Sequence, residues 1–133
     1  MAIAGVQQTL LLYTMQKADL TAQLASIMNK LTLASSQQLE LMQKTTEKKA
    51  YYADYISQNP QAVDTTEYQA LITGVEDDYE LQLAEINNWE KQLEQQQNSL
   101  ETQLKVVTSY EESWNSVLKS NIKKDFTYGQ TGS

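Results

Sequence analysis

The sequence predicts an all-α fold, a long antiparallel helical hairpin or coiled coil, and three observations indicate it. Apolar residues recur at alternating steps of three and four along both halves of the 133-residue chain, which is the spacing of one helix face. The single proline stands near the middle of the chain, and strand-like alternation is nearly absent. Two arms of similar length joined by a short turn should fold back on each other, because neither arm can bury its apolar stripe alone.

We expect residues 1–133 to form a single helical domain. The first arm covers residues 3–57, the turn 58–64 and the second arm 65–126, and a loose tail follows at 127–133. Asn59 precedes Pro60, whose ring clashes with the backbone before it and disfavours helix there. Asp64 then offers an N-cap oxygen, and Glu67 stands at the capping-box spacing. The Asn-Pro pair is therefore the best-marked break in the sequence.

Two further positions affect the continuity of the arms. Gly74 is a candidate end for a short extra helix that begins directly after the turn. Ser35 and Ser36 are candidate kink positions in the first arm, although the pattern favours a continuous helix there. A gathering of Lys119, Lys123 and Lys124 near the end of the second arm suits the negative end of a helix dipole.

A heptad seam on both arms is the predicted association surface. Lys17 is a polar position within it, and in the second arm its residues return every seven positions. Around residues 32–38 the first-arm seam weakens, and a looser apolar face then resumes with Leu39, Leu41, Met42 and Ile56. The seam consists of Val6, Leu10, Tyr13, Leu20, Leu24, Ile27, Leu31, Ile86, Leu93, Leu100, Leu104, Val107, Trp114 and Leu118.

The 17 glutamines are an unusual feature of the composition. Gln95, Gln96 and Gln97 interrupt the second-arm seam between Leu93 and Leu100. Polar residues at coiled-coil core positions fix register or subunit number at a cost in stability. The alternative is a locally loose, hydrated stretch. We slightly favour the register role, with Gln96 as its test position, since the glutamines at positions 23, 37, 38 and 43 can lie roughly opposite.

Aromatic residues suggest a second contact surface. Tyr51, Tyr52 and Tyr55 lie just before the turn and are spread too widely for one helical face. Some of them must be exposed in an isolated hairpin, which makes them a candidate contact patch. Trp89 and Trp114 fall on or beside the second-arm seam and are more simply interpreted as core residues.

Missing residue types argue against an enzyme. The chain has no His and no Cys, so it lacks the usual general base, the usual nucleophile and the commonest transition-metal ligands. Glu76, Asp77, Asp78 and Glu80 lack the spacing of a calcium loop, and a solvated helix face explains them. The four glycines are scattered, which excludes a glycine-rich phosphate loop. We expect no catalytic residues, no cofactor and no metal site.

Charge and hydropathy limit the classes of partner that the chain is expected to bind. The net charge is −7 and every basic residue is lysine, so no basic face for nucleic acid can be drawn. The longest apolar run covers residues 10–13, far short of a membrane span. The first lysine, Lys17, follows that run, whereas a cleaved leader has its basic residues first. These features predict no membrane insertion and a location that is cytoplasmic, or exported without a cleaved signal peptide.

The profile of the whole chain resembles the small leaderless helical proteins exported by bacterial type III-like and flagellar-type systems. Those needle, rod and filament subunits share the absence of Cys, an acidic composition rich in Gln, Asn and Ser, a turn in the middle of the chain and a long final helix with an apolar end. Here that end reads VLKSNIKKDF at residues 117–126. Secreted hairpins of the WXG type are a poorer match, because the turn reads Gln58-Asn59-Pro60 and has no Trp-x-Gly.

The sequence therefore predicts a structural or assembly protein, a hairpin that self-associates as a homo-oligomer or polymer, and the resemblance implies a subunit of an exported filament or appendage. The alternative is a cytoplasmic adaptor or secretion chaperone that binds another helical protein. Both follow from the same argument: a two-helix hairpin leaves apolar side chains uncovered, and a partner would cover them.

Overall fold

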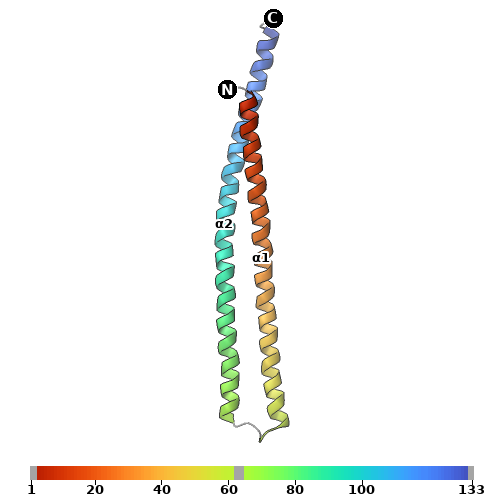
Figure 1. The fold of residues 1–133 in the computed structure, drawn as a ribbon, viewed down its shortest axis with the longest axis vertical. Coiled ribbons are helices and arrows are strands. Elements are labelled where there is room, and N and C mark those ends of the chain that lie inside the picture. The colour runs from red at the N-terminus through yellow and green to blue at the C-terminus, as the bar shows by residue number, and fades with distance from the viewer. Residues whose placement is uncertain (1–2, 62–64, 132–133) are drawn as a thin grey trace. The chain divides into compact units, whose positions relative to one another are not determined.

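The computed structural model describes residues 3–61 and 65–131, and it confirms the predicted all-α helical hairpin. Helix α1 covers Ile3–Gln58 and helix α2 covers Thr65–Thr131. The described residues contain no strand. The two helices run in opposite directions and pack against each other (Figure 1). As expected, α1 passes through Ser35 and Ser36 without a break in its helix.

Helix α1 ends where the proline requires it to end. Gln58 is its last residue, one position before Asn59, whose backbone is restricted by Pro60. The Asn59 backbone N–H donates to the Tyr55 carbonyl at 2.9 Å, and the Asn59 side-chain amide donates to the same oxygen at 3.2 Å. These two bonds satisfy a carbonyl at the helix end, where the last turn lacks its own donors. The predicted N-cap, Asp64, lies outside the described residues.

Helix α2 differs from the prediction at both ends. Gly74 is an internal residue of α2, so no short extra helix precedes the long one among the described residues. The continuous helix is favoured because the acidic and apolar residues after Gly74 keep its pattern. At the other end α2 continues to Thr131, past the predicted end near residue 126.

Gly74→Ala is expected to raise the free energy of unfolding by about 1 kcal/mol, because glycine is a poor helix former and alanine the best. A Cβ added at Gly74 meets no atom within 4 Å, so no clash offsets the gain. Urea unfolding followed by circular dichroism measures the change. The reciprocal variant Ala84→Gly, at an exposed position of the same helix, should lose a similar amount. A destabilised Gly74→Ala would contradict a continuous α2.

The packing of the chain divides into two units, which we describe separately. Unit 1 combines Met1–Met28 with Gln96–Ser133, and unit 2 is Asn29–Gln95. In each unit a segment of α1 lies against a segment of α2. That the whole chain forms one domain stays a prediction.

The seam within unit 1 follows the expected heptad steps. On α1 the least exposed residues fall at positions 3, 6, 10, 13, 17, 20, 24 and 27, and on α2 at 97, 100, 104, 107, 111, 114, 118 and 121. Val6 is 0% exposed, and Leu20 and Ile27 are nearly as well covered. Alternating steps of three and four keep these side chains on one face of each helix.

The seam within unit 2 follows the same steps of three and four, except that two steps of four succeed each other at positions 41, 45 and 49. On α1 it runs through positions 31, 34, 38, 41, 45, 49, 52 and 56. Ala34 is 0% exposed, and Gln38, Thr45 and Lys49 are half-buried. Leu39 and Met42, which were expected on the apolar face, are 55% and 52% exposed. Small and polar residues therefore occupy seam positions, while these two larger apolar residues face outward.

Candidate interaction surfaces

The fourteen predicted seam residues are all covered to some degree within the chain. Val6, Leu20, Ile27 and Leu93 are buried, and the other ten are half-buried. The seam pairs α1 with α2 inside each unit. A surface for another chain therefore has to be sought among the exposed residues.

Polar contacts fix the pairing of the helices in unit 1. The Lys17 ammonium lies 3.3 Å from a carboxylate oxygen of Glu111, and the Thr14 hydroxyl donates to the other oxygen at 3.0 Å. One turn of helix before Lys17, the rings of Tyr13 and Tyr110 lie 5.6 Å apart between their centroids. Lys17 thus has its partner on the facing helix, and a shift of register would separate the two charges.

Unit 2 has its own polar contacts across the seam. The Gln38 amide donates to Asn87 at 2.8 Å and to Glu90 at 2.9 Å. Nearer the turn, the Lys49 ammonium lies 3.0 Å from Glu76. Gln38 was expected to lie roughly opposite the glutamines at 95–97. In the structure its side chain instead bonds to Asn87 and Glu90, which lie earlier in α2.

The glutamine cluster contributes a seam residue at a different position from the one expected. Gln97 is half-buried at the step between Leu93 and Leu100, whereas Gln95 and Gln96 are exposed. Gln96 therefore lies outside the seam within the chain, and its predicted role in register or in hydrogen bonds between subunits stays a prediction. Gln97 is the residue whose side chain the seam has to accommodate.

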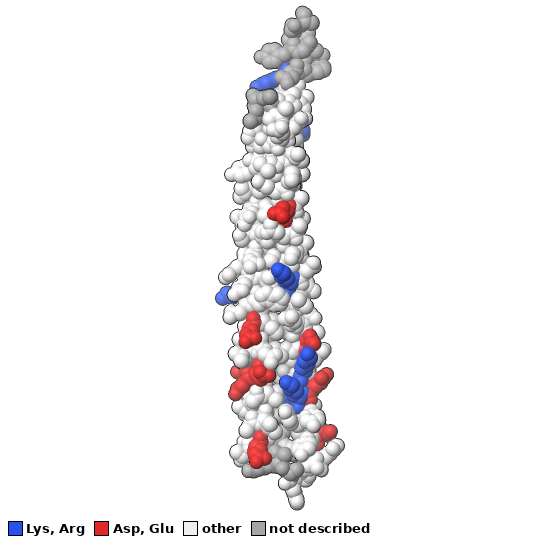
Figure 2. Space-filling view, viewed as in Figure 1, with Lys and Arg blue, Asp and Glu red and all other residues white. Residues whose placement is uncertain are grey.

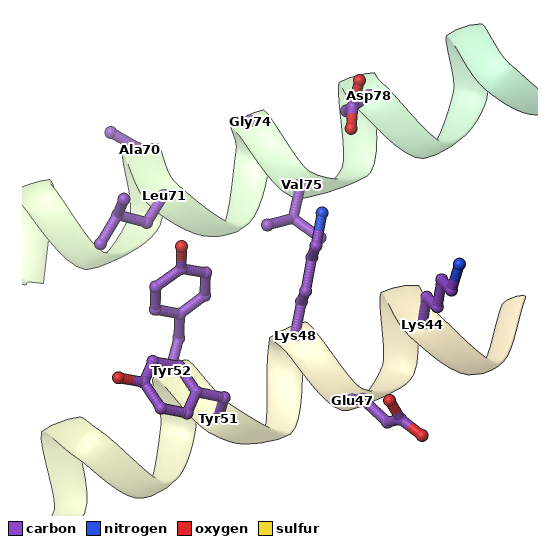
Figure 3. Close-up of a pocket in the computed structure, with 10 residues that line it drawn as sticks. All are labelled: Lys44, Glu47, Lys48, Tyr51, Tyr52, Ala70, Leu71, Gly74, Val75 and Asp78. Atoms are coloured by element: carbon purple, nitrogen blue, oxygen red, sulfur yellow. The ribbon is translucent and has the colours of Figure 1, made fainter. Parts of the chain in front are cut away.

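The three tyrosines before the turn are not equally exposed. Tyr51 is 67% and Tyr55 42% exposed, while Tyr52 is half-buried at a seam position. The rings of Tyr51 and Tyr52 meet edge-on, with 5.6 Å between centroids and an interplanar angle of 69°. Figure 3 shows Tyr52 pointing towards α2 near Leu71, whereas the ring of Tyr51 lies alongside α1. The predicted patch is therefore an exposed pair beside a seam residue.

An open hollow of about 630 Å³ adjoins this pair in unit 2. Lys44 and Lys48 contribute from α1, and Leu71, Gly74 and Val75 from α2 (Figure 3). A smaller hollow of about 160 Å³ lies among the tyrosines, with Ile56, Tyr68 and Leu71. Sequence reasoning missed the α2 side of this surface, and Tyr68 was the one aromatic signal that pointed to it. Tyrosine rings beside lysine side chains suit contact with a protein surface.

Charge is distributed unevenly between the units. Unit 1 has five lysines and five acidic residues, whereas unit 2 has five lysines and twelve acidic residues. Unit 2 therefore carries the whole net charge of −7. Over the face drawn in Figure 2, unit 2 has many red and blue side chains, and the described surface of unit 1 is largely uncharged. Within the described ranges, no three acidic residues are grouped so that they could hold a metal ion.

Comparison with known proteins gives this chain no family, because it matches no family model, no curated protein and no solved structure. The class is therefore defined by the fold alone, a two-helix antiparallel hairpin. Among residues 3–61 and 65–131, no helical stretch is long and apolar enough to cross a lipid bilayer.

Proposed function

We propose that this chain is a structural or assembly protein, a helical hairpin that associates with copies of itself. The observation that carries the proposal is the number of large apolar side chains that lie exposed on both helices.

Much of the exposed surface is apolar. Single exposed apolar residues are ordinary on soluble proteins, but here the large apolar residues on the outside outnumber the buried ones. The buried apolar residues of the described chain are Val6, Leu20, Ile27, Ala34 and Leu93. Those exposed are Leu11, Leu12, Met15, Met28, Leu33, Leu39, Met42, Tyr51, Tyr55, Leu71, Leu81, Val106, Tyr110, Val117 and Ile122. Further copies of the chain would cover part of this surface.

An exported filament or appendage is the assembly we propose for this hairpin. A polymer needs contacts on more than one surface of each subunit, and both units carry exposed apolar residues. The resemblance to leaderless helical subunits of bacterial export systems favours the same assembly.

The melting temperature is expected to rise with protein concentration, because association stabilises the folded chain by mass action. Circular dichroism melts over a hundredfold range of protein concentration centred on about 10 μM measure the rise. Electron microscopy at the highest concentration then separates a growing filament from a small closed oligomer. A melting temperature that is independent of concentration would contradict self-association.

The second candidate is an adaptor or secretion chaperone that binds a partner protein. The exposed tyrosine pair and the adjoining hollow in unit 2 favour it, since aromatic residues are enriched at protein interfaces. If the chain stays monomeric at every concentration and binds a helical partner through Tyr51 and Tyr55, the adaptor or chaperone function takes the place of self-association.

A further inference from the structure

On the basis of the proposed self-association, we infer that the exposed face of α1 in unit 1 is the surface on which a second copy docks. This face, which we call the α1 outer face, consists of Leu11, Met15, Ala18, Ala22 and Ala25. The contact is symmetric, with the same face of both chains packed together. The surface and the occupant rest on separate observations.

The spacing of the α1 outer face is that of a second seam. Its five residues follow at steps of four, three, four and three, and all are exposed. Leu11 is 60% and Met15 62% exposed. Alanine at the remaining positions lets a second helix approach closely, towards the short end of the 8–10 Å range of interaxial distances. The face can therefore pack against another helix while the inner seam stays paired.

Charge distinguishes this face from the rest of the surface. Between residues 3 and 28 the charged residues are Lys17 and Asp19. Lys17 is paired with Glu111, and Asp19 accepts a hydrogen bond from Gln23 at 2.8 Å. The described α2 surface of unit 1 mixes its exposed apolar residues with lysines and glutamates at 101, 105, 112 and 119. Docking on the α1 outer face thus removes little charge from water, which is the costly step in forming an interface.

Net charge favours contact between the unit 1 segments of two copies. Unit 1 is neutral, and unit 2 carries −7. Contact between two unit 2 surfaces would bring like charges together, which is unfavourable. The occupant is therefore a second copy, bound through the neutral unit.

Leu11→Lys is expected to weaken association by about a hundredfold, roughly tenfold for each of the two symmetric lysines. Leu81→Lys is the matched control, because Leu81 is 62% exposed and lies on α2 in unit 2. Sedimentation velocity of both variants beside the wild type measures the dissociation constants. Circular dichroism checks that each variant is as helical as the wild type.

The outcomes separate this inference from the proposed function. If the wild type associates and Leu81→Lys weakens it as much as Leu11→Lys, the α1 outer face is not the contact, although self-association stands. If Leu11→Lys associates as tightly as the wild type, the inference is likewise overturned. A wild type that never associates overturns both.

Single cysteines test the docking surface, because the chain has no cysteine of its own. Cysteines are placed one at a time at Leu11, Met15, Ala18, Ala22 and Ala25, and Ala84→Cys in unit 2 is the control. A disulfide needs Cα atoms within about 7 Å, so at least one of the five positions should cross-link two chains more than the control does if the two outer faces meet. Cross-linking at none of them above the control would overturn the inference.

Discussion

Leu93→Ala is expected to lower the free energy of unfolding by about 2–5 kcal/mol, the cost of lost burial and of the cavity left behind. Leu93 is 3% exposed on the unit 2 seam. With few other buried side chains in that unit, the surroundings have little apolar material with which to refill the space. Urea unfolding followed by circular dichroism measures the loss.

Leu81→Ala is the control for this variant. Leu81 is 62% exposed on the same helix, so its truncation should change the free energy of unfolding by less than about 0.5 kcal/mol. Equal losses of unfolding free energy at Leu93 and Leu81 would mean that the face of α2 containing Leu93 does not pack against α1 in unit 2.

Ile27→Asp is expected to destabilise unit 1 by about 3–5 kcal/mol, because it buries a carboxylate with no cation beside it. Ile27 is 6% exposed. Trp114 lies on the seam of unit 1 and Trp89 on that of unit 2. In a Trp89→Phe background, tryptophan fluorescence therefore reports the unfolding of unit 1 alone.

Ser26→Asp adds the same charge one residue earlier, at an exposed position. The midpoint of the Trp114 transition should stay near that of the parent protein for Ser26→Asp and fall markedly for Ile27→Asp. If both variants unfold at the same urea concentration, position 27 is not an inner seam position of unit 1.

The parts of the fold that depend on strong local signals were predictable. The Asn59-Pro60 pair placed the end of α1 within one residue, because a proline restricts the backbone before it whatever the surroundings. The heptad positions from Val6 to Leu31 were correct because every one except Lys17 is apolar. The partner of Lys17 could not be predicted, since Glu111 is far away in sequence and depends on the register between the helices.

The seam of unit 2 was harder to recognise. Ala34, Gln38, Thr45 and Lys49 occupy seam positions, but a search for large apolar residues passes over them. Leu39 and Met42 were chosen instead, and they face outward. Because polar seam positions are hard to recognise in the same way, the register role was predicted for Gln96, whereas Gln97 is the glutamine that lies on the seam. Gly74 suggested a break, yet one glycine costs a helix only about 1 kcal/mol relative to alanine, which the rest of α2 outweighs.

Interaction surfaces followed less directly from the sequence. The exposure of Tyr51 and Tyr55 was foreseeable, because three tyrosines within five residues cannot all lie on one face. The α1 outer face was not recognised, because its alanines carry no strong signal. Which apolar stripe pairs within the chain is decided by the facing helix, and the sequence of one arm does not contain that information.

Sedimentation equilibrium of the 133-residue chain over a range of micromolar concentrations tests self-association most directly. The exposed apolar surface predicts a mass of at least two chains that rises with concentration, and salt should strengthen the association by screening the negative charge of unit 2. A mass of 15.1 kDa, that of one chain, at every concentration and ionic strength would contradict it.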